Sequence, residues 1–285
     1  MLNLAQRNLK IFFRQKSAVF FSLLGVFVII GLYIVFLGDV WSEDFEDLPG
    51  INNLMNNWIM AGIISVTAIT TTMGAFGVMV EDKVRKNSKD FYAAPLKRRK
   101  IVGGYVLSAY LIGLLMSVLA FILGEAYIVF SGGDLLSGLS MIKVIGIILL
   151  SVMMSSSLVF FIVSFFSSTS AFATASTIIG TLVGFLTGIY LPIGSLPDGV
   201  QWAVKLFPVS HAGALIRQVM METAMATSFA GIPENYLSDF QKMMGVTYTY
   251  GDFTATATTH LLVIIGTTIV FLLLALLNIS RKKQN

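Results

Sequence analysis

The sequence predicts an all-α membrane protein with six transmembrane helices, and three observations support this fold class. Hydrophobic residues make up 56% of the 285 residues, charged residues 12%, and the mean hydropathy is +0.83. Soluble domains are about 45–50% apolar and about 25% charged. Six segments are apolar over about 20 residues, the length that a helix needs to cross a bilayer core of about 30 Å. Lys and Arg are concentrated in alternate connections, which is typical of membrane proteins.

The predicted spans form one transmembrane domain over residues 18–285. They cover residues 18–38, 58–80, 103–130, 139–165, 171–191 and 257–279. With a cytoplasmic N-terminus, 15 of the 19 Lys and Arg residues fall on the cytoplasmic side, whereas the first external loop is acidic. We therefore expect a multi-pass protein of a bacterial plasma membrane with both termini in the cytoplasm.

Residues 1–17 are predicted to form a short amphipathic helix ahead of the first span. Leu9, Phe12 and Phe13 follow the i, i+3, i+4 spacing of an apolar helix face, and basic residues fall largely on the other side. Such a helix is expected to lie along the inner membrane surface. The alternative is an ordinary frayed, positively charged terminus.

The external region 192–256 is too apolar at its start to be a free loop, and prolines interrupt it. Irregular backbone at membrane depth is tolerated only where protein or a cavity surrounds it. We therefore expect two short re-entrant helices, about 198–206 and 210–224. Residues 225–256 form either an external cap or a flexible loop.

Several kinds of chemistry are excluded by the residues themselves. The chain has no cysteine, so it forms no disulfide or thiolate metal site. It has no G-x-x-x-x-G-K-[ST] phosphate loop and no H-E-x-x-H zinc motif. His211 and His260 are expected to be interfacial hydrogen-bonding residues. We predict no catalytic or metal site, and we attribute the net charge of +4 to cytoplasmic loops rather than to nucleic-acid binding.

Polar residues inside the predicted spans are candidates for a cargo path. Glu125 is the only acidic residue well inside a predicted span, and such residues often mark a pathway or a partner contact. Alternatively, its position near the external end lets it reach interfacial water. Thr67 and Thr71 either line a semi-polar path or bond carbonyls within their own helix.

The fifth predicted span carries small residues at four-residue spacing: Ser176, Gly180, Gly184 and Gly188. Small residues on one helix face let two helix backbones approach closely. This pattern predicts either a seam between two subunits or tight packing within one subunit.

The segment from Glu81 to Lys100 holds eleven charged residues around the uncharged patch "FYAAPL". A loop that serves only to fix topology needs no apolar patch. An aromatic anchor with a charged rim is what a docking surface needs. We therefore expect this loop, residues 81–102, to bind another protein.

With these features the sequence resembles the permease subunit of type-2 ATP-binding-cassette exporters. The acidic pair and "DFYAAPLKRRKIVGG" match the family's coupling loop between spans 2 and 3, and residues 1–17 match its elbow helix. The stretch "LPIGSLPDGVQWAVKLFPVSHAGALIRQ" resembles its re-entrant segment, with Phe207 where Asn is usual. The sequence departs from the family where the coupling loop often reads Arg-Gly-Thr, at residues 85–88.

The resemblance implies export driven by ATP, which is bound with Mg²⁺ and hydrolysed by two copies of a separate ATPase subunit. A second permease, identical or homologous, completes the complex among membrane lipids, and this chain binds no cofactor of its own. The implied coupling residues are Glu81, Asp82, Phe91, Tyr92, Pro95, Leu96 and Arg98.

The expected cargo is an amphipathic drug, an antimicrobial peptide or a lipid, with polysaccharide or sodium as alternatives within the family. Two other classes stay open. An ion-coupled secondary transporter would favour inverted repeats and ionisable groups at the midplane. A non-transporting scaffold or immunity protein would need no ATPase.

Overall fold

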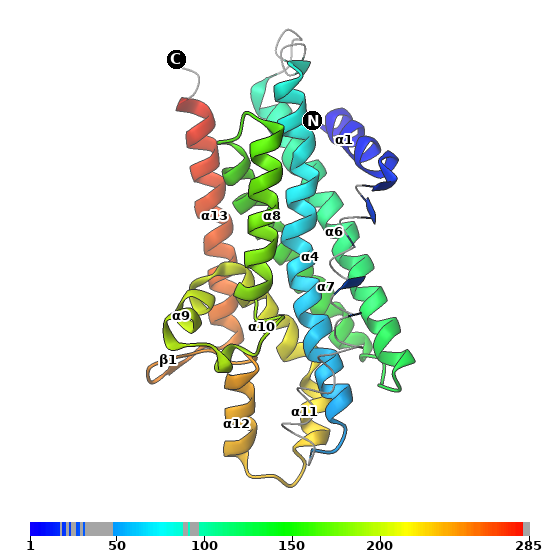
Figure 1. The fold of residues 1–285 in the computed structure, drawn as a ribbon, viewed down its shortest axis with the longest axis vertical. Coiled ribbons are helices and arrows are strands. Elements are labelled where there is room, and N and C mark those ends of the chain that lie inside the picture. Colours follow the sequence, from blue (N-terminus) through cyan, green and yellow to red (C-terminus); the bar gives the residue numbers. More distant parts are fainter. Residues whose placement is uncertain are drawn as a thin grey trace.

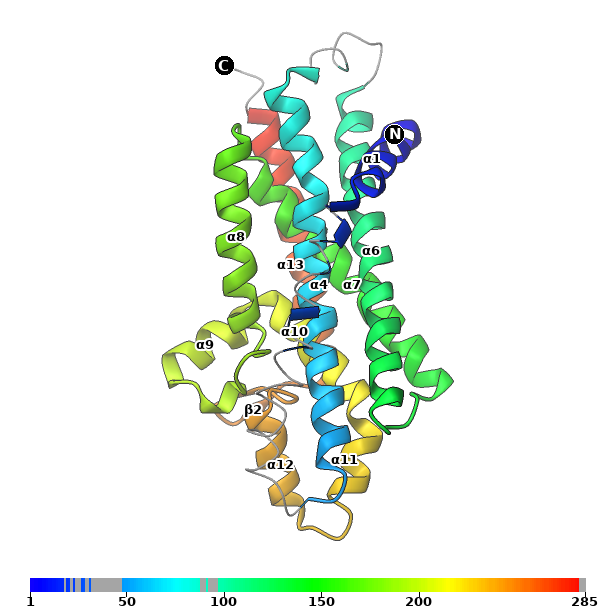
Figure 2. The same ribbon diagram turned by 45° about the vertical axis from the view of Figure 1, so that its right-hand side comes forward.

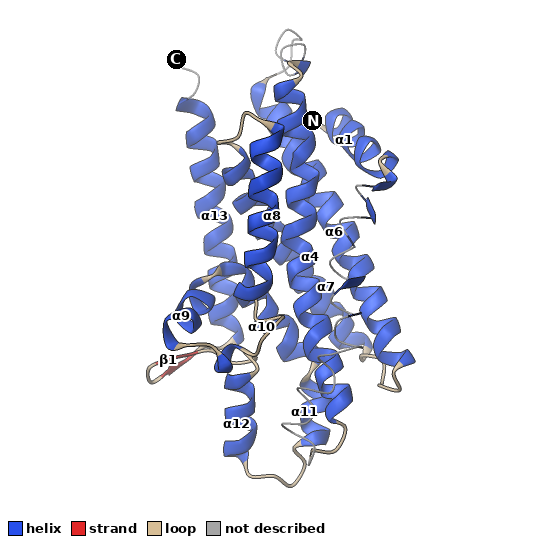
Figure 3. Ribbon diagram, in the orientation of Figure 1, coloured by secondary structure: helices blue, strands red, loops and turns tan. Residues whose placement is uncertain are grey.

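The computed structural model describes residues 1–17, 48–87 and 97–281, together with single positions at 19, 20, 23, 27, 28, 31 and 91. The predicted first span, 18–38, and the acidic loop after it lie mostly outside the described residues. Within the described chain the fold is almost entirely helical, and its two short strands form one hairpin (Figure 3).

Among the described residues, five helices are long and apolar enough to cross a membrane. They are α4 (Ile51–Val84), α6 (Arg98–Phe130), α7 (Gly138–Val163), α8 (Thr169–Leu186) and α13 (Ala257–Arg281). These helices run side by side along the long axis of the molecule (Figure 1). They correspond to the second to sixth predicted spans.

The observed bounds correct three of these predictions, one of which is that for α6, which begins at Arg98 rather than at 103. Helix α4 begins at Ile51 rather than at 58, and in its polar first turns the Asn57 side-chain amide donates to the carbonyl of Asn53 one turn earlier. Helix α8 ends at Leu186 rather than at 191. Gly188 has φ of +64°, and the N–H of Ile189 bonds back to the carbonyl of Gly184, which closes the helix end.

Helix α1 (Leu2–Arg14) confirms the predicted helix near the N-terminus and packs against α6. Its buried side chains are Ala5, Asn8 and Phe12, while Leu4 contacts Gly104 of α6 at a separation that leaves no room for a side chain. The N-terminus, the end of α4, the start of α6 and the end of α13 lie at this end of the bundle, which we call the α1 end (Figure 2).

The opposite end, which we call the α12 end, is built from residues 192–256. Its elements are η2 (Ile193–Ser195), α9 (Asp198–Leu206), α10 (Pro208–Met220), α11 (Glu222–Ser228), α12 (Glu234–Met243), β1 (Thr249–Tyr250) and β2 (Phe253–Thr254). The strands pair antiparallel. Helix α9 has the predicted bounds 198–206, whereas the segment predicted as one helix over 210–224 is divided at Met221 between α10 and α11. The segment 225–256 is structured rather than a free loop.

Helix α10 is the most buried element of the α12 end. It packs against α4, α7 and α13, and most of its side chains are buried. Among the five long helices α4 is the most buried, whereas α8 and α13 are mostly exposed. The core therefore centres on α4, and α8 and α13 present broad faces outward.

Candidate functional site

Asp82, one of the predicted coupling residues, lies in the last turn of α4 with only 3% of its surface exposed. Arg7 of α1 donates to both carboxylate oxygens, Nη1 to Oδ2 at 2.6 Å and Nη2 to Oδ1 at 2.8 Å. The Tyr105 hydroxyl donates to Oδ2 at 2.7 Å, and the Asn87 amide donates to Oδ1 at 3.1 Å. Each oxygen thus has two donors from this chain.

The ion pair continues into a second set of hydrogen bonds between α1 and α6. Nη1 of Arg7 also donates to the Asn8 side-chain oxygen at 3.0 Å, and the Asn8 amide donates to the Ser108 hydroxyl at 3.1 Å. Ser108 in turn donates to the Tyr105 carbonyl at 2.8 Å. The hydrogen bond to Asp82 raises the pKa of Arg7 above its already high ordinary value, so the guanidinium stays charged.

The neighbouring acid, Glu81, has a different environment. Its carboxylate forms an exposed ion pair with Arg85 one turn later, at 2.7 Å. Beyond α4 the chain turns sharply at Lys86, whose φ of 63° lies in the left-handed region that favours glycine. This turn leads to Asn87, which bonds back to Asp82. Of the two predicted acids, only Glu81 remains open to a partner.

The aromatic part of the predicted docking patch is described at one position. Phe91 is half-buried, and the guanidinium carbon of Arg7 lies 5.3 Å from its ring centre, within cation–π range. Tyr92, Pro95 and Leu96 lie outside the described residues, as does the side chain of Arg98, which begins α6. Phe91 is thus joined to the same cluster as Asp82.

The predicted cargo-path threonines are turned into their own helix. Thr67 and Thr71 are buried, and their hydroxyls donate to the carbonyls of Ile63 and Thr67 at 2.7 and 2.6 Å. This is the alternative in which helix carbonyls satisfy the hydroxyls. In this conformation the two hydroxyls are not presented to a passing molecule.

Glu125 lies near the α12 end of α6 and is 6% exposed. One carboxylate oxygen accepts the N–H of Leu136 at 3.1 Å, and the other has no partner in the described chain. Leu136 lines a pocket of about 110 Å³, but Glu125 does not. The carboxylate is therefore buried behind the pocket wall rather than at the surface.

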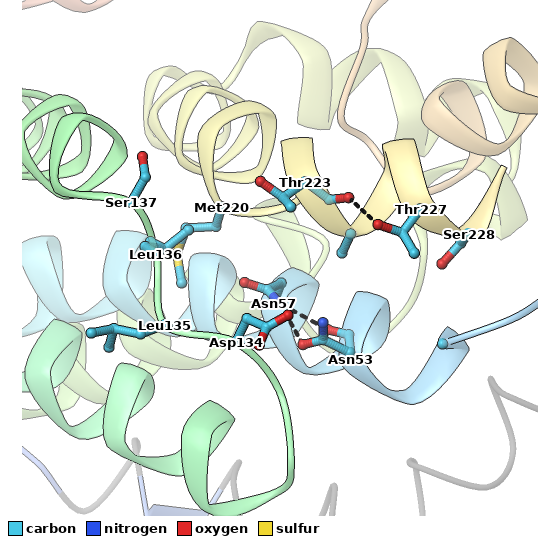
Figure 4. A pocket seen from close by; sticks show the side chains of 12 residues that line it. Asn53, Asn57, Asp134, Leu135, Leu136, Ser137, Met220, Thr223, Thr227 and Ser228 are labelled. Carbon is cyan, nitrogen blue, oxygen red and sulfur yellow. Dashed lines mark hydrogen bonds between the residues drawn. The ribbon is translucent and has the colours of Figure 1, made fainter. Parts of the chain in front are cut away.

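The pocket is polar on two sides (Figure 4). Asn53 and Asn57 of α4 face Asp134, which belongs to the connection between α6 and α7, and Thr223 and Thr227 of α11 lie across from them. The asparagines bond to each other at 3.1 Å, and the Thr227 hydroxyl bonds to the Thr223 carbonyl at 3.0 Å. Both of these bonds stay within one helix, so neither joins the two sides of the pocket.

The four small residues of the predicted seam do not share one environment. Gly180 has open space on its side-chain face, and Ser176 bonds within α8. A side chain at Gly184 would collide with the ring of Tyr190 from the same chain, and Gly188 lies beyond the helix end. Packing within the chain therefore explains Gly184, and helix termination explains Gly188, while Gly180 is free.

Arg217 of α10 is a charged residue of the predicted re-entrant segment, and the sequence predicts no role for it. It is fully buried, and its Nη2 donates to the carbonyls of Thr187 and Gly188, both at 3.0 Å. Its guanidinium lies 4.9 Å from the ring centre of Trp58, and its Nε and Nη1 have no partner in the described chain. Burial lowers the pKa of Arg217 to about 10, so it is charged at neutral pH.

The two histidines, predicted as separate hydrogen-bonding residues, bond to each other. Their Nδ1 atoms lie 2.8 Å apart, and Nε2 of His211 lies 2.8 Å from the Lys205 carbonyl. Because a carbonyl only accepts, Nε2 of His211 carries a proton and its Nδ1 accepts from His260. Burial lowers the pKa of His211 below 6.5, which favours this neutral arrangement.

Sequence reasoning missed the cluster around Arg7 because its members are far apart in the chain. One signal was present in α1: Asn8 lies on the apolar helix face, three residues after Ala5 and four before Phe12. A polar residue in such a position requires a buried partner. The identity of that partner, Ser108, emerges only from the packing of α1 on α6.

Comparison with known proteins gives a family for the chain. No curated protein sequence matches it at a significant level. Residues 13–277 match the family model described as ABC-2 family transporter protein, which covers most of the chain. This chain is therefore an integral membrane protein of the ABC-2 transporter family, whose members are membrane subunits of ATP-binding-cassette transporters.

Proposed function

We propose that this chain is the membrane-spanning subunit of an ATP-driven exporter in the plasma membrane, with the α1 end facing the cytoplasm. The family match over residues 13–277 carries the proposal. The sequence contains no phosphate-binding loop, so ATP and Mg²⁺ bind to a separate ATPase subunit in this scheme. Two copies of that subunit serve a pair of permeases.

The ATPase contact is assigned to the connection between α4 and α6. Glu81 is available there because its only described partner is the exposed Arg85. The apolar patch "FYAAPL" supplies the anchor, and the basic residues before α6 supply a rim. ATP binding would close the ATPases and displace this connection together with the ends of both helices.

Purification of the tagged full chain from its native membranes tests the proposal. An ATPase subunit should co-purify, and the complex should hydrolyse ATP in a vanadate-sensitive manner. Phe91→Ala combined with Tyr92→Ala should lower the yield of that subunit. Retention of ATPase association and cargo-stimulated hydrolysis by the double variant would refute the docking assignment. Absence of any ATPase from the wild-type preparation would favour an ion-coupled transporter or a scaffold.

The cargo is proposed to be an amphipathic drug, antimicrobial peptide or lipid, because the region 192–256 forms only a modest cap of short helices and one hairpin. Glu125 is the candidate polar contact for cargo or for a partner subunit. Glu125→Gln should then reduce cargo-stimulated hydrolysis, measured against a panel of such compounds, or reduce assembly. Wild-type hydrolysis and wild-type assembly in this variant would show that Glu125 contacts neither cargo nor a partner subunit.

The seam with a second permease is proposed to lie along α8 at Gly180. Gly180→Leu should lower dimer recovery in mild detergent without unfolding the chain, since nothing lies within 4 Å of a Cβ atom added at Gly180. Gly266→Leu is the matched control, because Gly266 of α13 is also open. Equal dimer yield in both variants would place the seam elsewhere. Gly184→Leu is less informative, because it collides with Tyr190 inside the chain.

A further inference from the structure

We propose that Arg7 and Asp82 are positioning residues for coupling: their ion pair fastens α1 to the connection between α4 and α6. A displacement of that connection by the ATPase is thereby carried into α1 as well as into α4 and α6. This inference rests on the proposed function, and it assigns to Asp82 a role inside the chain rather than a contact with the ATPase.

The Asp82 carboxylate is already satisfied within the chain. Arg7, Tyr105 and Asn87 supply two donors to each of its oxygens, between 2.6 and 3.1 Å. With 3% of its surface exposed, Asp82 offers an ATPase subunit neither a free lone pair nor access. A paired and fully hydrogen-bonded carboxylate of this kind fixes geometry, because removing one partner leaves a buried charge.

The cluster around the ion pair spans every element of the α1 end that the proposed coupling involves. Arg7 belongs to α1, Asp82 to α4 and Tyr105 to α6. Asn87 and Phe91 belong to the connection itself, and both are held by the pair, Asn87 through Asp82 and Phe91 through the guanidinium of Arg7. The two ends of a five-residue stretch, 87–91, are thus both tied to one ion pair.

Attachment of α1 to the bundle does not depend on the ion pair alone. Apolar contacts already hold α1 on α6, since Leu4 packs directly on Gly104 and Phe12 is 3% exposed. Asn8 adds a buried hydrogen bond to Ser108. Loss of the ion pair should therefore leave α1 docked on α6. It should release the link from α1 to Asp82 and Phe91.

The experiment uses the full chain in complex with the ATPase that co-purifies with it. Because the chain has no cysteine, Lys10→Cys and Leu274→Cys place two spin labels on each copy of the chain, at exposed sites on α1 and α13. Electron paramagnetic resonance distances are compared without nucleotide and with ATP and vanadate. Hydrolysis by the complex and the yield of ATPase subunit are measured in parallel.

In the wild type, ATP and vanadate should change the distance between the labels. Arg7→Gln and Asp82→Asn should retain the ATPase subunit but lose this change, with a several-fold loss of stimulated hydrolysis. Arg14→Gln is the matched control, because it removes the same charge from the same helix at an exposed site. It should behave as the wild type.

Several outcomes would overturn the inference. A wild-type distance change in Arg7→Gln or Asp82→Asn would show that α1 moves without the ion pair. If these variants do not fold, Arg7→Lys decides, since Lys keeps the charge but lacks the two-pronged geometry of Arg; full coupling in Arg7→Lys would also reject the proposal. A wild-type chain that recruits no ATPase would instead reject the proposed function.

An engineered disulfide tests whether the ion pair transmits movement to α1 or only attaches α1 to α6. In the Arg7→Gln background, Asn8→Cys with Ser108→Cys places a disulfide where α1 and α6 already touch through a 3.1 Å hydrogen bond. The disulfide should leave coupling impaired, because it does not restore the link to Asp82. Recovery of coupling on oxidation would mean that the ion pair only attaches α1.

Discussion

The two ends of the bundle hold an arginine in two different ways. Arg7, at the α1 end, has 34% of its side chain exposed and pairs with a carboxylate. Arg217, at the α12 end, is fully buried and is held by two carbonyls and the face of Trp58. The described chain gives Arg217 no carboxylate partner. The charge of Arg7 is neutralised by a carboxylate near water, whereas the charge of Arg217 is buried away from water.

The difference indicates which end of the molecule is built to move. Water reaches Arg7, whose side chain is 34% exposed, so the α1 end can shift with its ion pair intact. Arg217 cannot leave its site without removing donors from the carbonyls of Thr187 and Gly188, which follow the C-terminal end of α8, where the helix dipole also favours a cation. We expect the α12 end to act as a rigid support and the α1 end to act as the adjustable part.

The largest expected effect on stability comes from replacing Arg217 at the α12 end. Arg217→Ala should lower the free energy of unfolding by about 3–5 kcal/mol, because it loses two charge-assisted hydrogen bonds and leaves a cavity. The cavity would lie between Gly62 and Gly245, whose missing side chains leave room for the guanidinium. Thermal unfolding in detergent, followed by tryptophan fluorescence, measures the change. An unchanged melting temperature would contradict the proposed rigidity.

The corresponding change at the α1 end should be smaller. Asp82→Ala should lower the free energy of unfolding by about 1–3 kcal/mol, because it leaves the Tyr105 hydroxyl without its acceptor while water compensates Arg7 in part. The same melting experiment measures it, with Glu81→Ala as the control for an exposed ion pair. A loss larger than that of Arg217→Ala would reverse the comparison.

Acidic pH should destabilise the fold at the α12 end, where His211 lies. Burial holds the pKa of His211 below 6.5, so the unfolded chain binds a proton more readily than the folded one. Stability contributed by the neutral histidine is present above pH 6.5 and is lost as the pH falls below that value. Tyr248, which lies against both rings, stays neutral because burial raises its pKa to about 12.

Melting temperatures between pH 7.5 and pH 5 test this dependence. His211→Gln should reduce the slope of the profile, because it removes one of the two buried histidines that bond to each other. An equal slope in the wild type and in this variant would assign the acid sensitivity to other residues.

The smallest expected effect is the change in melting-temperature differences with salt concentration. Raising the ionic strength to about 1 M shortens the screening length to about 3 Å, which weakens exposed pairs more than buried charges. The melting difference between the wild type and Asp82→Ala should therefore shrink in high salt, whereas that for Arg217→Ala should not. Equal salt dependence at both ends would show that the two arginines are equally screened.

The sequence alone determined the long helices that the structure describes, because hydropathy over about 20 residues depends only on composition along the chain. It also determined α9, which Pro197 and Pro208 delimit at 198–206. The helix near the N-terminus followed from the spacing of Leu9, Phe12 and Phe13. Each of these features is local, so neighbouring residues suffice to predict it.

Only the tertiary structure decided which polar residues meet. Arg7 and Asp82 are 75 positions apart, and His211 and His260 are 49 apart. Sequence spacing therefore contained no information on either pair. The same holds for Gly184, whose spacing suggested a seam but whose neighbour is Tyr190 of its own chain. A buried polar group needs a partner of matching chemistry, but helix packing selects which residue provides it.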